Sequence, residues 1–315
     1  MIKIFVLLLL TGVLSAYGQD KKILYEMVEL ERGVNSRFHD AAPIVSPDGN
    51  TLYFFVANHP DNRYGINNSQ DIWYSEKDEH GRWQSAVHMP PPLNMHRFNQ
   101  VLSVLDHGNL LFVRGGKGSS DEGFSYTGRI NGGWSDPEPV EVKGYEKMKK
   151  GIFSGGFLSS DGRILLLYFS ETENSKYSDI YVCFQEGKNQ FSRPLKIEEP
   201  ISTRRDEFGP YLTSGMNTMY FASNRWGGLG ASDIYRTERL DDSWLKWSEP
   251  VNIGEPINTD GFDAYFSIDA EEKIAFTTRA FMSADGGHLN IIGLIPRPEI
   301  YLAGTVRNKE TNESV

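Results

Sequence analysis

Short apolar runs alternate with polar turns along most of the chain, and they recur at a nearly constant spacing. The clearest turn is Ser46-Pro47-Asp48-Gly49, and each turn of this kind leads into an apolar run. Asp and Gly tolerate positive φ, so Asp-Gly between two apolar runs indicates a β-hairpin. We therefore predict strands over residues 51–57, 109–113, 163–169, 218–222 and 273–277.

A second motif repeats in step with these runs. An Asp-Ile-aromatic triplet begins at Asp71, Asp179 and Asp233, and the gaps of 108 and 54 residues correspond to two periods and one. A further aromatic opens another strand in four units, at Trp83, Trp134, Phe191 and Trp247. Each unit then holds four short strands and is too small to bury its faces without neighbours, which is typical of propeller blades. We expect these aromatics to pack between blades.

The fifth unit lacks its last strand. Its third strand, 289–295, is followed by Pro296-Arg297-Pro298, whereas the run 23–30 near the N-terminus leads into Val34-Asn35. That ending matches the endings of last strands in other units, at Leu93-Asn94 and Ile257-Asn258. The sequence therefore predicts an all-β fold, a five-bladed β-propeller over 19–295, which the N-terminal strand closes beside 289–295.

Residues 1–18 have the pattern of a secretory signal peptide. A positive start at Lys3 precedes an apolar run over 4–14, and small residues at 16 and 18 predict cleavage after Gly18. The alternative is a retained membrane anchor, but the run is shorter than the roughly 20 residues of a spanning helix. We expect an exported protein with no transmembrane segment. Cys183, the only cysteine, is expected to be a core residue.

One long segment carries a family resemblance. Residues 220–235, Tyr-Phe-Ala-Ser-Asn-Arg-Trp-Gly-Gly-Leu-Gly-Ala-Ser-Asp-Ile-Tyr, together with the turn at 46–49, resemble TolB-type propeller repeats. The likeness is to exported bacterial proteins that join such a propeller to an OmpA-like peptidoglycan-binding domain. This resemblance implies a location in the periplasm or at the outer-membrane periphery. It assigns peptidoglycan binding to none of the residues in this sequence.

The C-terminal residues extend this resemblance. After a linker at 296–299, residues 300–315 look like the first strands of a truncated carboxypeptidase-regulatory-like β-sandwich. A disordered polar tail is the alternative. Whether an OmpA-like domain follows in the full gene product stays open.

Composition and spacing narrow the possible chemistry. With 32 Lys and Arg against 42 Asp and Glu, the formal charge of −10 makes nucleic acid an unlikely partner, since phosphate needs a clustered positive surface. The seven histidines show no metal-binding spacing, and no Gly-x-Ser-x-Gly nucleophile motif occurs. We predict no catalytic, cofactor-binding or metal-ligating residue.

Three carboxylates deserve comparison with glycosidases, which use Asp and Glu around the axis of some five-bladed propellers. Asp40, Glu207 and Asp263 stand at the starts of the expected innermost strands. Because they recur at one repeat position, we expect them to bond the N–H groups of a neighbouring loop. The same structural role is expected of the Asp residues in the Asp-Ile-aromatic triplets.

The expected loops divide into a basic, aromatic face and an acidic face. We predict a partner-binding surface on the basic face, formed by Arg97, Phe98, Arg204, Arg205, Arg225 and Trp226. Its partner would be an envelope protein or an anionic glycan, and scattered solvated charge is the alternative. The sequence thus predicts a non-enzymatic envelope-associated scaffold or interaction module. The alternative is a glycan-binding or glycoside-hydrolase propeller.

Overall fold

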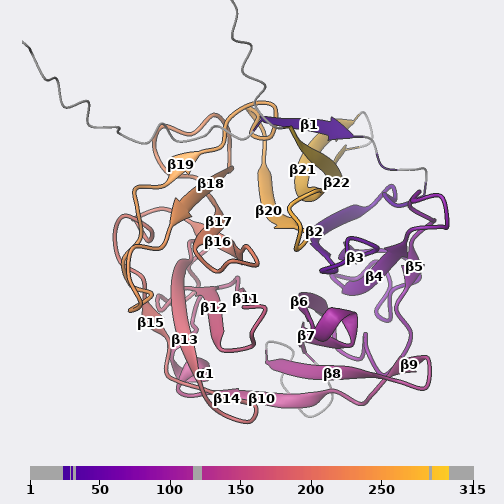
Figure 1. Ribbon diagram of the computed structural model, residues 1–315, viewed down its shortest axis with the longest axis horizontal. Coiled ribbons are helices and arrows are strands. Elements are labelled where there is room, and N and C mark those ends of the chain that lie inside the picture. The colour runs from indigo at the N-terminus through magenta and orange to yellow at the C-terminus, as the bar shows by residue number, and fades with distance from the viewer. Residues whose placement is uncertain (1–23, 29, 31–32, 116–122, 284–285, 298–315) are drawn as a thin grey trace, which may run out of the picture. The chain divides into compact units, whose positions relative to one another are not determined.

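The computed structural model describes residues 24–28, 30, 33–115, 123–283 and 286–297 (Figure 1). The compact unit considered below is Tyr25–Pro296. The predicted signal peptide at 1–18 and the predicted sandwich strands at 300–315 lie outside the described residues, as do residues 298–299 of the predicted linker. Where the structure describes the chain, no helix has the length and apolar character that a membrane span requires.

Two sheets follow the predicted repeat directly, each with four antiparallel strands in chain order. The first contains β2 (His39–Val45), β3 (Thr51–Ala57), β4 (Gln70–Glu76) and β5 (Val87–His88). The second contains β16 (Glu207–Leu212), β17 (Thr218–Ser223), β18 (Asp233–Glu238) and β19 (Val251–Asn252). Their turns form as expected: in the first, Ser46 Oγ donates to Asp48 Oδ1 at 2.6 Å.

A third sheet joins the two ends of the unit. It consists of β20 (Asp263–Ile268), β21 (Ala275–Ser283), β22 (Gly286–Arg297) and the N-terminal β1 (Leu24–Val28). The strand order is β1-β22-β21-β20, which confirms that the N-terminal strand pairs beside the last strand of the repeat. The contact is close, since a Cβ at Gly293 would lie 2.7 Å from the Val28 side chain. Tyr25 also meets Phe266 edge to face, with ring centroids 6.2 Å apart.

The remaining strands form one sheet of ten, which the repeat does not predict. One half holds β6 (Gln100–Leu105), β7 (Leu110–Arg114), β8 (Phe124–Ile130), β9 (Gly133–Trp134) and β10 (Glu138–Val142). The other half holds β11 (Gly155–Leu158), β12 (Ile164–Phe169), β13 (Asp179–Gly187), β14 (Gln190–Phe191) and β15 (Leu195–Lys196). The halves are joined because β10 pairs in parallel with β14. Two short helices, η1 (Asp106–Gly108) and α1 (Tyr145–Met148), complete the described elements.

The predicted interblade aromatics are buried. Trp83, just before the outermost strand of the first sheet, packs edge to face on Phe276 of β21, in the neighbouring sheet, at 5.6 Å. Trp134 of β9 belongs to a core cluster with Tyr53 and Ile72 of the first sheet. These two contacts lie between sheets, so Trp83 and Trp134 bind neighbouring repeats together, as expected for a propeller. Cys183 is also buried in the core.

Candidate functional site in the axial cavity

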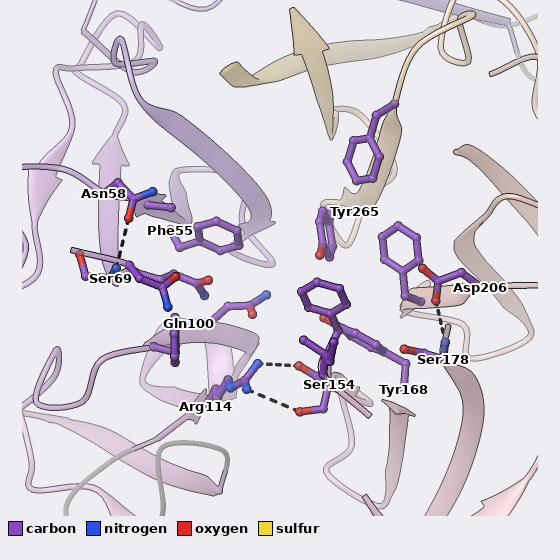
Figure 2. Close-up of a pocket in the computed structure, with 18 residues that line it drawn as sticks. Phe55, Asn58, Ser69, Gln100, Arg114, Ser154, Tyr168, Ser178, Asp206 and Tyr265 are labelled. Carbon is purple, nitrogen blue, oxygen red and sulfur yellow. Dashed lines mark hydrogen bonds between the residues drawn. The ribbon is translucent and has the colours of Figure 1, made fainter. Parts of the chain in front are cut away.

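A cavity of about 590 Å³ lies where the inner strands converge (Figure 2). Its wall draws side chains from all the sheets: from β3, β4, β6, β7, β12, β16 and β20, together with the loops beside them. The volume is within the range of small-molecule sites. Aromatic rings and neutral polar groups make up most of the wall, which also contains two charged side chains, Asp206 and Arg114.

Asp206 precedes β16 and supplies the only carboxyl among the described residues of the cavity wall. Its Oδ1 accepts a hydrogen bond from the Ser178 N–H at 2.7 Å, and its own N–H donates to Asn224 Oδ1 at 3.0 Å. Burial raises the pKa of Asp206 to about 6, although the Ser178 N–H acts in the opposite direction and nearby Glu207 adds to the rise. A carboxyl of this pKa can both give and accept a proton near neutral pH.

Arg114 ends β7 and places a guanidinium at the cavity wall. Its Nη1 donates to the Ser154 carbonyl at 2.5 Å, and its Nη2 lies 3.5 Å from Ser154 Oγ. These bonds orient the guanidinium toward the cavity in Figure 2. The cavity therefore presents a fixed positive charge and a titratable carboxyl to a single bound molecule.

Aromatic rings cover the wall between these charges. Phe208 and Phe262 are stacked at 6.0 Å, and Phe208 meets Tyr265 edge to face at 5.5 Å. Burial raises the pKa values of Tyr168 and Tyr265, and each phenol interacts with the other. Both hydroxyls therefore stay protonated at physiological pH and can donate hydrogen bonds.

The three carboxylates compared with glycosidases have the structural role that the sequence predicts. Asp40 Oδ2 accepts from the Ser36 N–H at 2.8 Å, and Asp263 Oδ2 accepts from the Thr259 N–H at 2.7 Å. Glu207 accepts from the Thr203 N–H at 2.9 Å. Each carboxyl thus fixes the loop before its strand. Among the triplet residues, Asp71 takes the Arg63 N–H at 2.6 Å, Asp233 takes the Leu229 N–H at 2.7 Å, and Asp179 pairs with Lys196 at 2.9 Å.

The six residues of the predicted partner surface do not form one free face. Phe98 lines the cavity, and Arg225 is turned inward, where it donates to the carbonyls of Pro200 at 3.1 Å and Ile201 at 2.7 Å. Arg225 also lies 3.6 Å from Glu207 and packs over the Phe221 ring. The Arg225 guanidinium is therefore occupied by a buried carboxylate and two carbonyls, and its part in partner binding stays a prediction.

The other four residues are accessible. Trp226 is 86% exposed, and the Arg205 guanidinium lies 4.0 Å from its ring centroid. Arg204 is exposed, and Arg97 donates to the Asn67 carbonyl at 2.6 Å. Because Arg205 directly precedes Asp206, the Arg205–Trp226 pair stands beside the cavity wall.

Sequence reasoning missed Asp206, Gln100, Tyr168 and Tyr265 as cavity residues. None stands at a repeated polar position, and the only available signal was that Asp206 has no acidic counterpart at the matching place in other units. The described part of the chain contains no cluster of three or more His, Cys, Asp or Glu side chains arranged to hold a metal ion.

Neither a family model nor a curated protein matches the chain. Among solved structures, a thermostable family-43 glycoside hydrolase matches with a TM-score of 0.51 and 13% identity, over 88% of this chain and 98% of that one. TolB from Acinetobacter baumannii matches with a TM-score of 0.43 and 10% identity, over 84% of this chain. Xylan β-1,4-xylosidase from Bacillus halodurans C-125 matches with 0.47 and 13%, also over 84%.

The likeness to the family-43 glycoside hydrolase agrees with the strand topology, and together they indicate a β-propeller fold. The chain spans 55% of the length of TolB and 56% of that of the xylosidase. At these identities the comparisons define the fold and leave the activity to be argued from the site.

One sequence-based conclusion needs correction, namely that the chain is not an enzyme. It is contradicted by the glycoside hydrolases among the solved structures, one of which shares this fold along nearly its whole length. Asp40, Glu207 and Asp263 do bond to the loops before their strands, as their recurrence at one repeat position predicts. The sequence comparison, however, weighed no other carboxyl near the axis. Asp206, at the cavity wall, was not considered.

Proposed function

We propose that this protein is a five-bladed propeller that binds a glycan in its axial cavity, with Asp206 as the acid–base group that acts on it. The five blades are the three four-stranded sheets and the two halves of the ten-stranded sheet, each half built on four main strands. We also propose that the protein is exported to the periplasm or the outer-membrane periphery, on the sequence pattern of residues 1–18.

The observation that carries this proposal is a carboxyl of raised pKa in an aromatic-lined cavity. Sugar rings present apolar C–H faces and polar edges, so a site with Phe208 and Phe262 on its wall and Gln100 and Arg114 among them can bind both. A side chain whose pKa is perturbed by burial in a cavity is a candidate for proton transfer. Most glycosidases use two carboxyl groups, whereas Asp206 is the one carboxyl on the described cavity wall. The proposal is therefore that the cavity binds a glycan and that Asp206 transfers the proton.

The test compares wild-type protein with Asp206→Asn and with Asp260→Asn, a control at an exposed position on a neighbouring loop. Neutral and uronate-containing oligosaccharides are titrated by calorimetry, and their products are separated by chromatography. We expect saturable binding of a glycan to wild type and to Asp260→Asn. Any turnover should be lost in Asp206→Asn and should change with an apparent pKa near 6. If no glycan binds wild type at millimolar concentration, the proposed function is wrong.

A second role is favoured by the exposed Trp226 and the half-buried Arg205 that lies over its ring. An exposed Trp with a guanidinium on one face suits an anchor for an envelope protein partner or an anionic glycan. We propose that this partner-binding surface is formed by Arg97, Arg204, Arg205 and Trp226.

A further inference from the structure

The inner strands of three sheets share an unusual local geometry. The pairing register shifts within β2, β16 and β20, where one extra residue forms a β-bulge. Each bulge contains a residue with left-handed backbone, two positions after the buried carboxyl: Ala42 with φ 53°, Gly209 with φ 58° and Tyr265 with φ 58°. Glycine adopts this conformation freely, whereas a residue with a large side chain is strained there.

Tyr265 is therefore the exception among equivalent positions. Ala42 and Gly209 show that the bulge forms with a small side chain or none, so the fold does not require an aromatic ring at this place. Non-glycine residues in left-handed backbone occur in turns, and strained ones also cluster at ligand-binding and catalytic sites. The ring of Tyr265 must be explained by what it contacts.

The ring contacts the cavity. Tyr265 lines both the 590 Å³ cavity and a second, much smaller cavity of about 20 Å³, and Gln100 and Tyr168 do the same. These three side chains thus lie at the boundary between the two spaces. In Figure 2 the Tyr265 ring reaches into the cavity from β20, and in this view it lies between Phe55 and Asp206.

The neighbouring blade makes room for this ring. A Cβ at Gly209 would lie 2.9 Å from Tyr265 Cδ1, which is closer than side chains tolerate. Gly209 therefore serves two needs, the left-handed backbone of its own bulge and the space that the ring of the next blade occupies. Burial, followed by the neighbouring Tyr168 hydroxyl, raises the pKa of Tyr265 well above its usual value, so the Tyr265 hydroxyl stays protonated and a bound sugar oxygen would compete with Tyr168 for its hydrogen bond.

We propose that Tyr265 is the floor of the axial cavity and a ligand-binding residue, whose hydroxyl donates a hydrogen bond to an oxygen of the bound sugar. The inference rests on the proposed glycan-binding function and adds to it the residue that ends the cavity. It also explains why a strained backbone position carries a tyrosine: the left-handed conformation directs the ring toward the axis.

The experiment uses two conservative variants that should behave in opposite ways. Tyr265→Phe keeps the ring and removes the proposed donor. Tyr211→Phe removes a hydroxyl that donates to the Ile268 carbonyl at 2.5 Å and lines only the smaller spaces below the main cavity. Glycan affinity is measured by calorimetry with the oligosaccharide that binds wild type best, and melting temperature by scanning calorimetry.

We expect Tyr265→Phe to lose affinity about tenfold or more, because a buried sugar oxygen loses its donor, with little change in melting temperature. We expect Tyr211→Phe to melt at a lower temperature and to keep wild-type affinity. If wild type binds and Tyr265→Phe binds equally well, the inference is wrong while the proposed function stands. If wild type binds no glycan, both are overturned.

Discussion

Glu207 and Asp206 are neighbours in the chain, but they belong to two different regions of the molecule. Glu207 starts an inner strand, is fully buried and accepts hydrogen bonds from Thr203 and Ser223. Asp206 stands just outside the strand, faces the cavity and accepts one hydrogen bond in the described structure, from Ser178. The first region is a set of loop-fixing carboxyls that recurs from blade to blade, and the second is a cavity wall to which each blade contributes different residues.

The comparison teaches how a repeat protein separates stability from function. A residue that recurs at one repeat position, such as Asp40 or Asp263, accepts an N–H group from the loop that precedes its strand. A residue unique to one blade, such as Asp206, does not have to fix the loop that precedes its strand. Its carboxyl is held in place with acceptor capacity left over for a ligand.

The largest effect is expected where a loop-fixing carboxyl is also part of a buried ion pair. Asp263→Ala removes the acceptor for Arg279 Nε at 2.8 Å and for the Thr259 N–H and hydroxyl. Because Arg279 would be left partly buried without its partner, we expect a loss of roughly 3–5 kcal/mol in the free energy of unfolding, measured with urea. Asp260→Ala, at an exposed position three residues away, should stay within about 0.5 kcal/mol. Equal losses in the two variants would remove the distinction between the regions.

The pH dependence of stability offers a second test. Burial raises the pKa of Asp40 from its usual value near 4 to about 7. The folded state then holds a proton that the unfolded chain has released, so this carboxyl stabilises the fold at low pH. That contribution is lost as the pH rises from about 4 to about 7.

Asp40→Asn should flatten the dependence. Each unit of pKa difference corresponds to about 1.4 kcal/mol, so the wild-type stability should fall more steeply than that of the variant across this window. Urea unfolding at intervals between pH 4 and pH 8 gives the two slopes. Asp206 acts in the same direction and is present in both proteins, so it cancels in the difference. Parallel slopes would show that Asp40 is ionised in the folded state.

The smallest effects are expected at two arginines that differ in burial: Arg225, which is turned inward, and Arg205, which lies at the surface. Arg225→Met should lower the free energy of unfolding by about 2 kcal/mol, since the carbonyls of Pro200 and Ile201 lose charged donors. Arg205→Met should change it by less than about 0.5 kcal/mol, because this guanidinium stacks on an exposed ring.

These expected changes in the free energy of unfolding show which arginines can be replaced in a test of partner binding. Arg204→Glu with Arg205→Glu should keep the fold intact and weaken capture of an envelope protein or anionic glycan, more at low salt than at high salt. Unchanged capture at both salt concentrations would identify the exposed arginines as solvated surface.

The repeat itself was readable because its causes are local. Hairpin turns such as Ser46–Gly49, strands of matching length and the missing last strand before Pro296 depend on residues close together in the chain. Each blade also packs mainly on its neighbours. The pairing of β1 beside β22 followed from counting strands, because an unpaired edge must be covered. Repeat equivalence was also enough to assign Asp40, Glu207 and Asp263 to the loops.

The tertiary structure determined the features that differ from one repeat to another. The parallel pairing of β10 with β14 joins two blades through residues about 50 positions apart, and no local pattern marks it. Arg225 turned inward because a buried carboxylate and two carbonyls lie within its reach. The cavity brings together Gln100, Asp206 and Tyr265 from three blades. Sequence periodicity determines the blades, whereas closing the ring determines which of their irregular residues meet at the axis.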